Sequence, residues 1–407
     1  MTTTSTRPVS ARFVALYAVG YVGSYIALVT PVAATLAFKV AELDPAGKEA
    51  SLGVIAAIGA LVAIVSNAGT GALSDRTRSR LGRRRPWIVG GALGGVVALA
   101  ITGFAPTLLV AGIGWVLSQL TLNMVLAALQ ALLPDQVPLE QRARVSAVLG
   151  IAQQVSPLLG IGLAYGVQAA GGGIGLMFLV PGAVGAVLMV LLAARIRDVP
   201  HDEPAPFSLA AFAIPRAARA DFAWTWSGRF FVILGFAVYT TYQPYFLADR
   251  LRIPEDGVLL QQLIALLIFA AVLTVSAVVC GRLSDRTGRR KPFVFASAAV
   301  VGVGLAMLAL TTTLPVFYAA AVVMGIGIGA FFAIDLALIT DVLPDKEHAA
   351  AKDMGIFNIA NSLPQSVAPA IAPLFLGASG DYTALFLAGG LFAVIGAVLI
   401  APIRAVR

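Results

Sequence analysis

Asp335 is an acidic residue that interrupts a long apolar segment, Ala330-Phe-Phe-Ala-Ile-Asp-Leu-Ala-Leu-Ile339. An ionisable group inside such a segment is costly to bury and marks a functional position by default. Because burial disfavours the charged form of a carboxyl group, Asp335 is a candidate to take up and release a proton. The alternative is a fixed structural pair with a cation such as Lys352 or Arg229.

Two short loops carry a second kind of chemistry, in which an aspartate precedes a run of basic residues. The first loop contains Leu73-Ser-Asp-Arg-Thr77, and the second contains Leu283-Ser-Asp-Arg-Thr287. The carboxylates of Asp75 and Asp285 can cap a helix N-terminus or pair with an arginine in one conformation and release it in another. The alternative is that these loops only set the membrane topology through their positive charge.

Amide and phenol side chains inside other apolar segments form a third set. Such groups combine hydrogen bonds with apolar walls, which suits a hydroxyl-rich or mixed polar solute. Each could instead join one helix to another, the commoner role of a lone Gln or Asn in a span. Tyr25 and Tyr242 occupy equivalent positions in the two halves, so we expect them to face each other. The candidates for a central cavity are Tyr21, Tyr25, Gln119, Asn123, Gln130, Gln153, Gln154, Tyr239, Tyr242, Gln243, Asn358 and Asn361.

The segments that carry these residues are long enough to cross a membrane. The chain is 59% hydrophobic and 12% charged, and its mean hydropathy is +0.91, whereas an ordinary soluble domain is about a quarter charged. Many apolar runs reach roughly 20 residues, the length that crosses a bilayer core of about 30 Å. We expect an all-α integral membrane protein with twelve transmembrane helices, at 12–38, 50–73, 87–105, 107–133, 143–169, 174–194, 229–248, 258–281, 293–311, 315–341, 353–377 and 382–402.

Landmarks recur along the chain at nearly constant spacing. Asp75 and Asp285 lie 210 positions apart, and Arg12 and Arg229 lie 217 positions apart. Such a repeat predicts two pseudo-symmetric six-helix bundles with a substrate site at their interface. Because Arg12 belongs at the mouth of the first span, we expect Arg229 at the membrane surface. The expected units are an N-terminal bundle at 1–194, a cytoplasmic linker at 195–228 and a C-terminal bundle at 229–407.

The basic residues are distributed unevenly between the two predicted sides of the membrane. With a cytoplasmic N-terminus, only four of the 28 Lys and Arg residues fall outside, so we expect both termini in the cytoplasm. The net charge of +8 is therefore a topology signal and not a nucleic-acid surface. One cysteine and two histidines, both in loops, predict no metal site. We expect a monomer in the plasma (inner) membrane, without cofactors.

The two loops resemble the major facilitator superfamily, whose loop signature after the second span runs Gly-x-x-x-Asp-Arg/Lys-x-Gly-Arg-Arg. The first loop matches with an insertion, Arg78-Ser-Arg80, and the second matches without one. The likeness covers essentially the whole chain and implies the twelve-helix fold and a transport function rather than an enzymatic one. The gating-loop residues that it implies are Gly71, Asp75, Arg76, Gly82, Arg83 and Arg84 in the first copy and Gly281, Asp285, Arg286, Gly288, Arg289 and Arg290 in the second.

Residues 74–87 resemble the branch that contains glycoside–cation symporters and sucrose-type proton symporters. We therefore expect proton-coupled symport of a small polar organic solute, with glycosides as one option, by alternating access. The runner-up is an antiporter that exports a drug or secondary metabolite, since Ser156-Pro157 partly resembles the Gly-Pro signature of drug–proton antiporters. A membrane sensor or an intramembrane enzyme is a third class. The absence of a partnered His, Cys or metal cluster around Asp335 disfavours an enzyme, and a sensor would normally carry a soluble output domain, which the sequence does not show.

Overall fold

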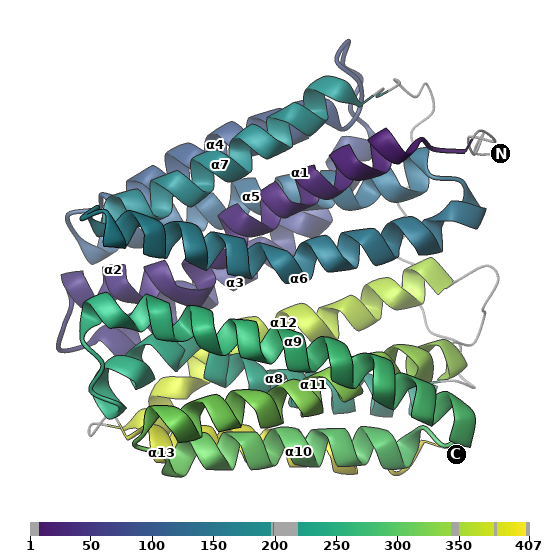
Figure 1. Ribbon diagram of the computed structural model, residues 1–407. Helices are drawn as coiled ribbons and strands as arrows, with labels where there is room; N and C mark the ends of the chain where they lie inside the picture. The colour runs from purple at the N-terminus through teal and green to yellow at the C-terminus, as the bar shows by residue number, and fades with distance from the viewer. Residues whose placement is uncertain (1–7, 197, 199–218, 343–349, 378–380, 404–407) are drawn as a thin grey trace. The chain divides into compact units, whose positions relative to one another are not determined.

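The computed structural model describes residues 8–196, 198, 219–342, 350–377 and 381–403, with the side chains of 219, 336–337, 339–342, 350–359 and 362 excepted. All of its regular secondary structure in these ranges is helical. The chain forms two compact units, residues 1–207 and 208–407. Each unit is a bundle of long helices (Figure 1).

In the first unit, three consecutive elements form one continuous span. Helix α1 (Ala11–Thr30) passes through the π-helix η1 (Pro31–Thr35) into α2 (Leu36–Leu43). Pro31 begins η1, and a proline lacks the N–H and the room that a regular α-helical turn requires, so the wider turn accommodates it. The other helices are α3 (Lys48–Asp75), α4 (Arg85–Gly103), α5 (Leu108–Gln136), α6 (Leu139–Ala169) and α7 (Ile174–Arg195).

The second unit repeats this plan, including a π-helix after a proline in its first span. Helix α8 (Arg219–Tyr245) contains Pro244 and leads into η4 (Phe246–Arg250). The other helices are α9 (Glu255–Thr287), α10 (Lys291–Leu310), α11 (Leu314–Val342), α12 (Ala350–Leu376) and α13 (Tyr382–Val398). Helix α8 begins inside the segment expected as a linker, and residue Phe222 is already buried in the core of the unit.

The twelve expected spans all fall on helices. Ten helical segments among the described residues are long and apolar enough to cross a membrane, and two shorter apolar helices, Leu363–Leu376 and Tyr382–Val398, lie at the positions of the last two spans. The prediction of an all-α fold with twelve membrane helices is confirmed.

The two units pack their helices in the same pattern. In the first unit the most extensive pairings are α4 with α5, α1 with α7, α3 with α5, α4 with α7 and α1 with α6. Numbered by span, the same five pairings dominate the second unit: α10 with α11, α8 with α13, α9 with α11, α10 with α13 and α8 with α12. The repeat in the sequence therefore corresponds to a repeat in the packing.

Glycines allow the first and sixth spans of each unit to touch. In the first unit, a Cβ at Gly23 would lie 2.5 Å from the carbonyl oxygen of Gly185. In the second, a Cβ at Gly235 would lie 2.3 Å from the carbonyl oxygen of Gly389. Small residues that bring backbones together are a common way to associate helices in a membrane. The scaffold is thus duplicated down to these contacts.

Candidate functional site

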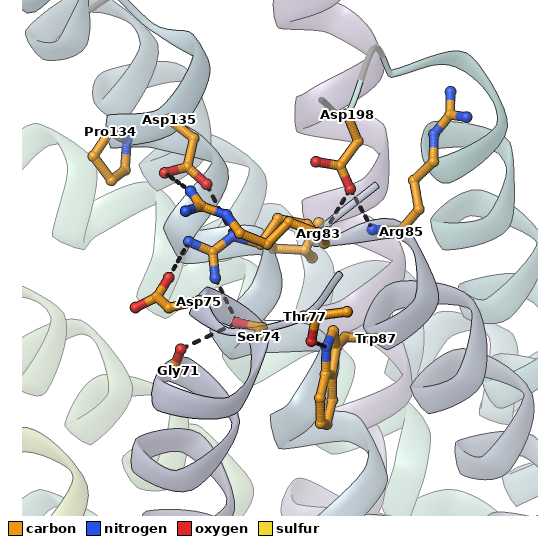
Figure 2. Close-up of polar contacts among 12 residues, drawn as sticks. Gly71, Ser74, Asp75, Thr77, Arg83, Arg85, Trp87, Pro134, Asp135 and Asp198 are labelled. Carbon is orange, nitrogen blue, oxygen red and sulfur yellow. Dashed lines mark hydrogen bonds and ion pairs between the residues drawn. The ribbon is translucent and has the colours of Figure 1, made fainter. Parts of the chain in front are cut away.

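The first hinge loop, between α3 and α4, is organised around the buried side chain of Arg84. Its Nε donates to Asp135 Oδ2 at 2.9 Å, its Nη2 to Asp75 Oδ1 at 2.5 Å, and its Nη1 to Ser74 Oγ. Figure 2 shows how the two carboxylates and the hydroxyl converge from the ends of α5 and α3. We call these four residues the Arg84 cluster. It ties together the ends of three helices within the first unit.

Neighbouring residues brace the same loop. Arg83 Nη2 lies 2.6 Å from Asp135 Oδ1, so Asp135 holds two consecutive arginines. Trp87 Nε1 donates to Thr77 Oγ1 at 2.8 Å and thereby closes the inserted turn (Figure 2). Arg84 is only 3% exposed, whereas the side chain of Asp75 is 41% exposed. The cation is therefore the fixed member of the cluster, and the carboxylate is the member that water reaches.

The second hinge loop, between α9 and α10, is built more loosely in the described residues. Asp285 Oδ1 lies 3.6 Å from Arg290 Nη1, and the Asp285 side chain is 71% exposed. Helix α9 ends at Gly288, whose φ of +63° is the left-handed conformation that glycine adopts readily. The two loops that are nearly identical in sequence thus differ in how deeply they bury their charges.

A separate charged site lies inside the second unit. Arg229 of α8 donates through Nη1 to Asp335 Oδ2 of α11 and through Nε to Asn361 Oδ1 of α12, the latter at 2.8 Å. Its guanidinium also lies 6.0 Å from the ring centroid of Phe332. Asp335 is fully buried, and its Oδ1 has no hydrogen-bond partner among the described residues. We call Arg229, Asp335 and Asn361 the Arg229 site.

The expected surface position of Arg229 is wrong. The residue is only 9% exposed and is ion-paired with Asp335 inside the bundle. The inference from Arg12 failed because Arg12 is exposed and has Val125, a buried apolar residue, at the position equivalent to Asp335. Only the second unit supplies a buried acid that can draw the arginine inward. The pairing matches the structural alternative stated for Asp335.

The cavity candidates of the first unit lie mostly within its bundle. The rings of Tyr21 and Tyr25 are 5.5 Å apart between centroids, and Gln130 hydrogen-bonds to Tyr21. Gln119 and Asn123 are buried on one face of α5, where Asn123 Nδ2 donates to Gln119 Oε1 at 3.2 Å. Gln154 is exposed on α6. Gln119 and Asn123 are therefore joined by a hydrogen bond, whereas Gln154 is exposed.

Several cavity candidates of the second unit are also hydrogen-bonded within their bundle. Gln243 Nε2 donates to the Tyr239 hydroxyl at 2.6 Å, and the Tyr242 hydroxyl donates to the carbonyl oxygen of Pro369 at 3.2 Å. Tyr242 is fully buried and so joins α8 to α12. Asn361 belongs to the Arg229 site, and the side chain of Asn358 lies outside the described residues. The expected meeting of Tyr25 and Tyr242 stays a prediction.

Sequence reasoning missed Ser74 and Asp135 as members of the first loop's network. Asp135 carried a usable signal, because Leu133-Pro-Asp135 recurs as Leu343-Pro-Asp345 at the same 210-residue spacing as Asp75 and Asp285. Ser74 carried a weaker one in the repeated Leu-Ser-Asp-Arg-Thr. Asp345 lies outside the described residues, so its counterpart contact is not part of the comparison of the loops.

Known proteins resemble this chain in sequence and in structure. The family model of the Major Facilitator Superfamily matches residues 12–275 and 225–407. The uncharacterized MFS-type transporter YfiU of Bacillus subtilis is 31% identical over 137 residues, which are 33% of this chain and 26% of that protein. The general alpha-glucoside permease of Schizosaccharomyces pombe is 31% identical over 123 residues, which are 26% of this chain and 22% of that protein. The chain thus matches about a quarter of the length of these relatives.

Solved structures show the same fold. A bacterial homologue of the human lysosomal transporter Spinster, inward-facing and unoccupied, superposes with a TM-score of 0.70 at 14% identity, covering 96% of this chain and 94% of the other. The nucleoside transporter NupG superposes with a TM-score of 0.75 at 14% identity, covering 96% and 99%. Since the family model matches residues in both halves, this chain belongs to the Major Facilitator Superfamily and is an integral membrane protein with the fold of these solved transporters.

Proposed function

We propose that this chain is a secondary active transporter that carries a small polar organic solute in symport with protons. The observation that supports this most strongly is the Arg229–Asp335 ion pair, which is buried among membrane-spanning helices. Charged groups at such depth are rare and mark ion or substrate pathways. The two six-helix bundles would provide alternating access for the solute, as duplicated transporters of this kind do.

The arrangement of the Arg229 site offers a simple route to coupling. One oxygen of Asp335 is held by Arg229, and the other has no partner among the described residues. A proton on that second oxygen would neutralise the carboxylate and weaken its attraction to the guanidinium. Because an unpaired buried charge is strongly destabilising, Arg229 would then need another acceptor, such as an oxygen of the solute. Proton binding and solute binding would be linked through Arg229.

The two hinge loops are the proposed gating elements. In the first, the exposed carboxylate of Asp75 can separate from Arg84 while Asp135 and Ser74 still hold the arginine. In the second, Asp285 pairs with Arg290 at longer distance. The remaining basic and glycine residues of the two loops are Arg76, Gly71, Gly82, Arg83, Gly281, Arg286, Gly288 and Arg289. Each loop would favour one conformation of the transport cycle and release it when its aspartate is freed.

The proposed solute is rich in hydroxyl groups, with glycosides as the first class to test. Hydrogen-bonding phenols and amides such as Tyr21, Gln130, Tyr239 and Gln243 recur inside both bundles. The partial likeness to a protein named general alpha-glucoside permease agrees with this choice. We further propose a monomer in the plasma (inner) membrane with both termini in the cytoplasm, because most Lys and Arg residues then fall inside.

Transport by purified protein in liposomes tests the proposal. An inwardly directed pH gradient should drive accumulation of a labelled glycoside from a panel that also contains cationic dyes. Asp335→Asn should abolish accumulation against the gradient while sparing solute exchange, and Asp256→Asn, at an exposed acid in α9, should change neither. Unchanged accumulation by the Asp335 variant would overturn its coupling role. Dye movement opposite to the proton flow would identify an exporting antiporter instead.

A further inference from the structure

Asp198 lies just beyond the end of α7, and its carboxylate covers the N-terminus of α4 (Figure 2). Asp198 Oδ2 accepts the backbone N–H of Arg84 at 2.5 Å and that of Arg85 at 2.8 Å. The first N–H groups of a helix have no partner within the helix and carry partial positive charge. The carboxylate therefore satisfies two donors and complements the helix dipole at the residue that organises the Arg84 cluster.

The turn before α4 is shaped to admit this carboxylate. Gly82 has a φ of +100°, and a Cβ at this position would lie 2.4 Å from Asp198 Cγ. A larger residue would thus be strained in the turn and would collide with Asp198. In addition, a guanidinium nitrogen of Arg85 donates to the carbonyl oxygen of Ile196. Asp198 consequently holds the backbone of Arg84, while Ser74, Asp75 and Asp135 hold its side chain.

The sequence of this junction recurs in the second unit without the aspartate. Ile196-Arg-Asp-Val199 recurs 207 positions later as Ile403-Arg-Ala-Val406, so that alanine replaces the aspartate. Lys291, the counterpart of Arg85, donates to the carbonyl oxygen of Ile403, the counterpart of Ile196. The contact between the start of the third span and the end of the sixth is therefore common to both units.

The space beside the glycine of each turn also differs between the two units. Gly288 is the counterpart of Gly82 and likewise has a positive φ, of +63°. A Cβ at Gly288 would meet no atom within 4 Å among the described residues, whereas one at Gly82 would collide with Asp198. Among the described residues, a carboxylate that fills the space beside this glycine is therefore a feature of the first turn.

We propose that Asp198 is a positioning residue that locks the first hinge loop by capping α4. The capped helix holds the Arg84 guanidinium where Asp75 and Asp135 meet it. The consequence for transport rests on the gating role proposed above, but the locking itself does not.

Hydrogen exchange on the purified full chain in lipid nanodiscs tests the locking without any transport assay. Asp198→Ala should speed exchange of the amides around Arg84 and Arg85 by about fivefold to tenfold, the size of a lost N-cap. Asp198→Asn keeps an acceptor oxygen and should restore most of the protection. Arg195→Ala, at an exposed position at the same helix end, should leave these amides unchanged. Equal protection in Asp198→Ala and wild type would overturn the proposal.

Transport kinetics then separate the locking from the gating role. If Asp198 acts through the Arg84 cluster, Asp198→Ala should lower the maximal rate more than the apparent affinity, and its effect should be non-additive with that of Asp75→Asn. Faster exchange with unaltered transport would retain the lock and reject the gating role. Additive effects of the two substitutions would show that Asp198 does not act through the cluster.

Discussion

In the first unit the buried arginine, Arg84, lies in the loop between the second and third spans, where water still reaches its partner Asp75. In the second unit the buried arginine, Arg229, lies within the bundle against Asp335, which is fully buried. The scaffold around them is the same, because the same five helix pairings and the same glycine contacts recur. The two units therefore share their helix packing but differ in where their buried arginines lie.

The difference shows which features the fold requires and which the function requires. The positions equivalent to Arg229 and Asp335 hold the exposed Arg12 and the buried Val125. A six-helix bundle of this kind therefore folds with an apolar residue where the second unit has an acid. A buried ion pair is a poor source of stability compared with apolar side chains of similar volume, so its presence in one unit alone points to a role in transport.

The largest predicted effect comes from breaking the Arg229–Asp335 pair on one side. Arg229→Ala should lower the free energy of unfolding by about 3 to 5 kcal/mol, because it leaves the Asp335 carboxylate buried without a counter-charge. Thermal unfolding of purified protein in detergent measures this. Arg12→Ala, at the equivalent exposed position, should change stability by less than about 0.5 kcal/mol.

A paired substitution separates stability from function at the same site. Replacing both residues, with Arg229→Met and Asp335→Leu, should recover most of the lost stability but not the proton-driven accumulation. Equal stability losses in Arg229→Ala and Arg12→Ala would contradict the asymmetry between the units. Restored accumulation in the paired variant would show that the ion pair is only structural.

The second prediction concerns what the units share. Gly23→Ala and Gly235→Ala should each destabilise by about 1 to 3 kcal/mol, because the added Cβ lies 2.3 to 2.5 Å from a backbone oxygen of the facing helix. Gly69→Ala in α3 meets nothing within 4 Å and should gain up to about 1 kcal/mol from its better helix propensity. A large loss in only one of the first two variants would show that the scaffold is less symmetric than the pairings indicate.

The third prediction compares the two hinge loops. Arg84→Gln should cost about 1 to 2 kcal/mol, the lower part of the range for hydrogen bonds to charged groups, because Asp75 and Asp135 are partly solvated. Asp285→Asn should cost less than about 0.5 kcal/mol, since the 3.6 Å pair of Asp285 with Arg290 is solvent-exposed. Denaturation of both variants under one condition measures the difference, and equal costs would contradict the unequal burial.

Much of the architecture follows from the sequence, because span length, apolar content and the repeated loops each have a direct physical reading. Asp335 is conspicuous for the same reason, as an acid within an apolar run. The predicted position of Arg229 was wrong because it followed from symmetry with Arg12. An arginine is buried only where an opposite charge pairs with it, and the first unit has no such charge at the equivalent position.

The details of the first hinge were beyond the sequence for a different reason. Three consecutive arginines, 83 to 85, are equivalent as sequence, and the backbone turn at Gly82 decides which of them points inward. Asp198 approaches this turn from 114 residues away along the chain. No local sequence pattern predicts such a contact, and comparison of the two repeats shows only that the aspartate at 198 is an alanine at 405.

The smallest effect is a dependence on pH at the start of α13 that α7, its counterpart in the first unit, should not show. Asp381 caps α13, where its Oδ1 accepts the N–H of Thr383 at 2.9 Å, and this hydrogen bond, with a contribution from Arg250, lowers the pKa of the carboxyl group. The pKa of an aspartate in the unfolded chain is about 3.9, and the pKa of Asp381 in the folded chain lies below it. The capping interaction therefore stabilises the folded chain fully at a pH above about 3.9, and this stabilisation is lost as the pH falls through the folded-state pKa. Helix α7, which begins after Gly173 without a side-chain cap, has no such group.

Hydrogen exchange, corrected for its intrinsic pH dependence, should therefore show that the amides in the first turn of α13 exchange a few-fold faster below about pH 4, with α7 unaffected. Asp381→Asn, which can cap but cannot titrate in this range, should remove the pH dependence, and its persistence in that variant would assign the effect to another group.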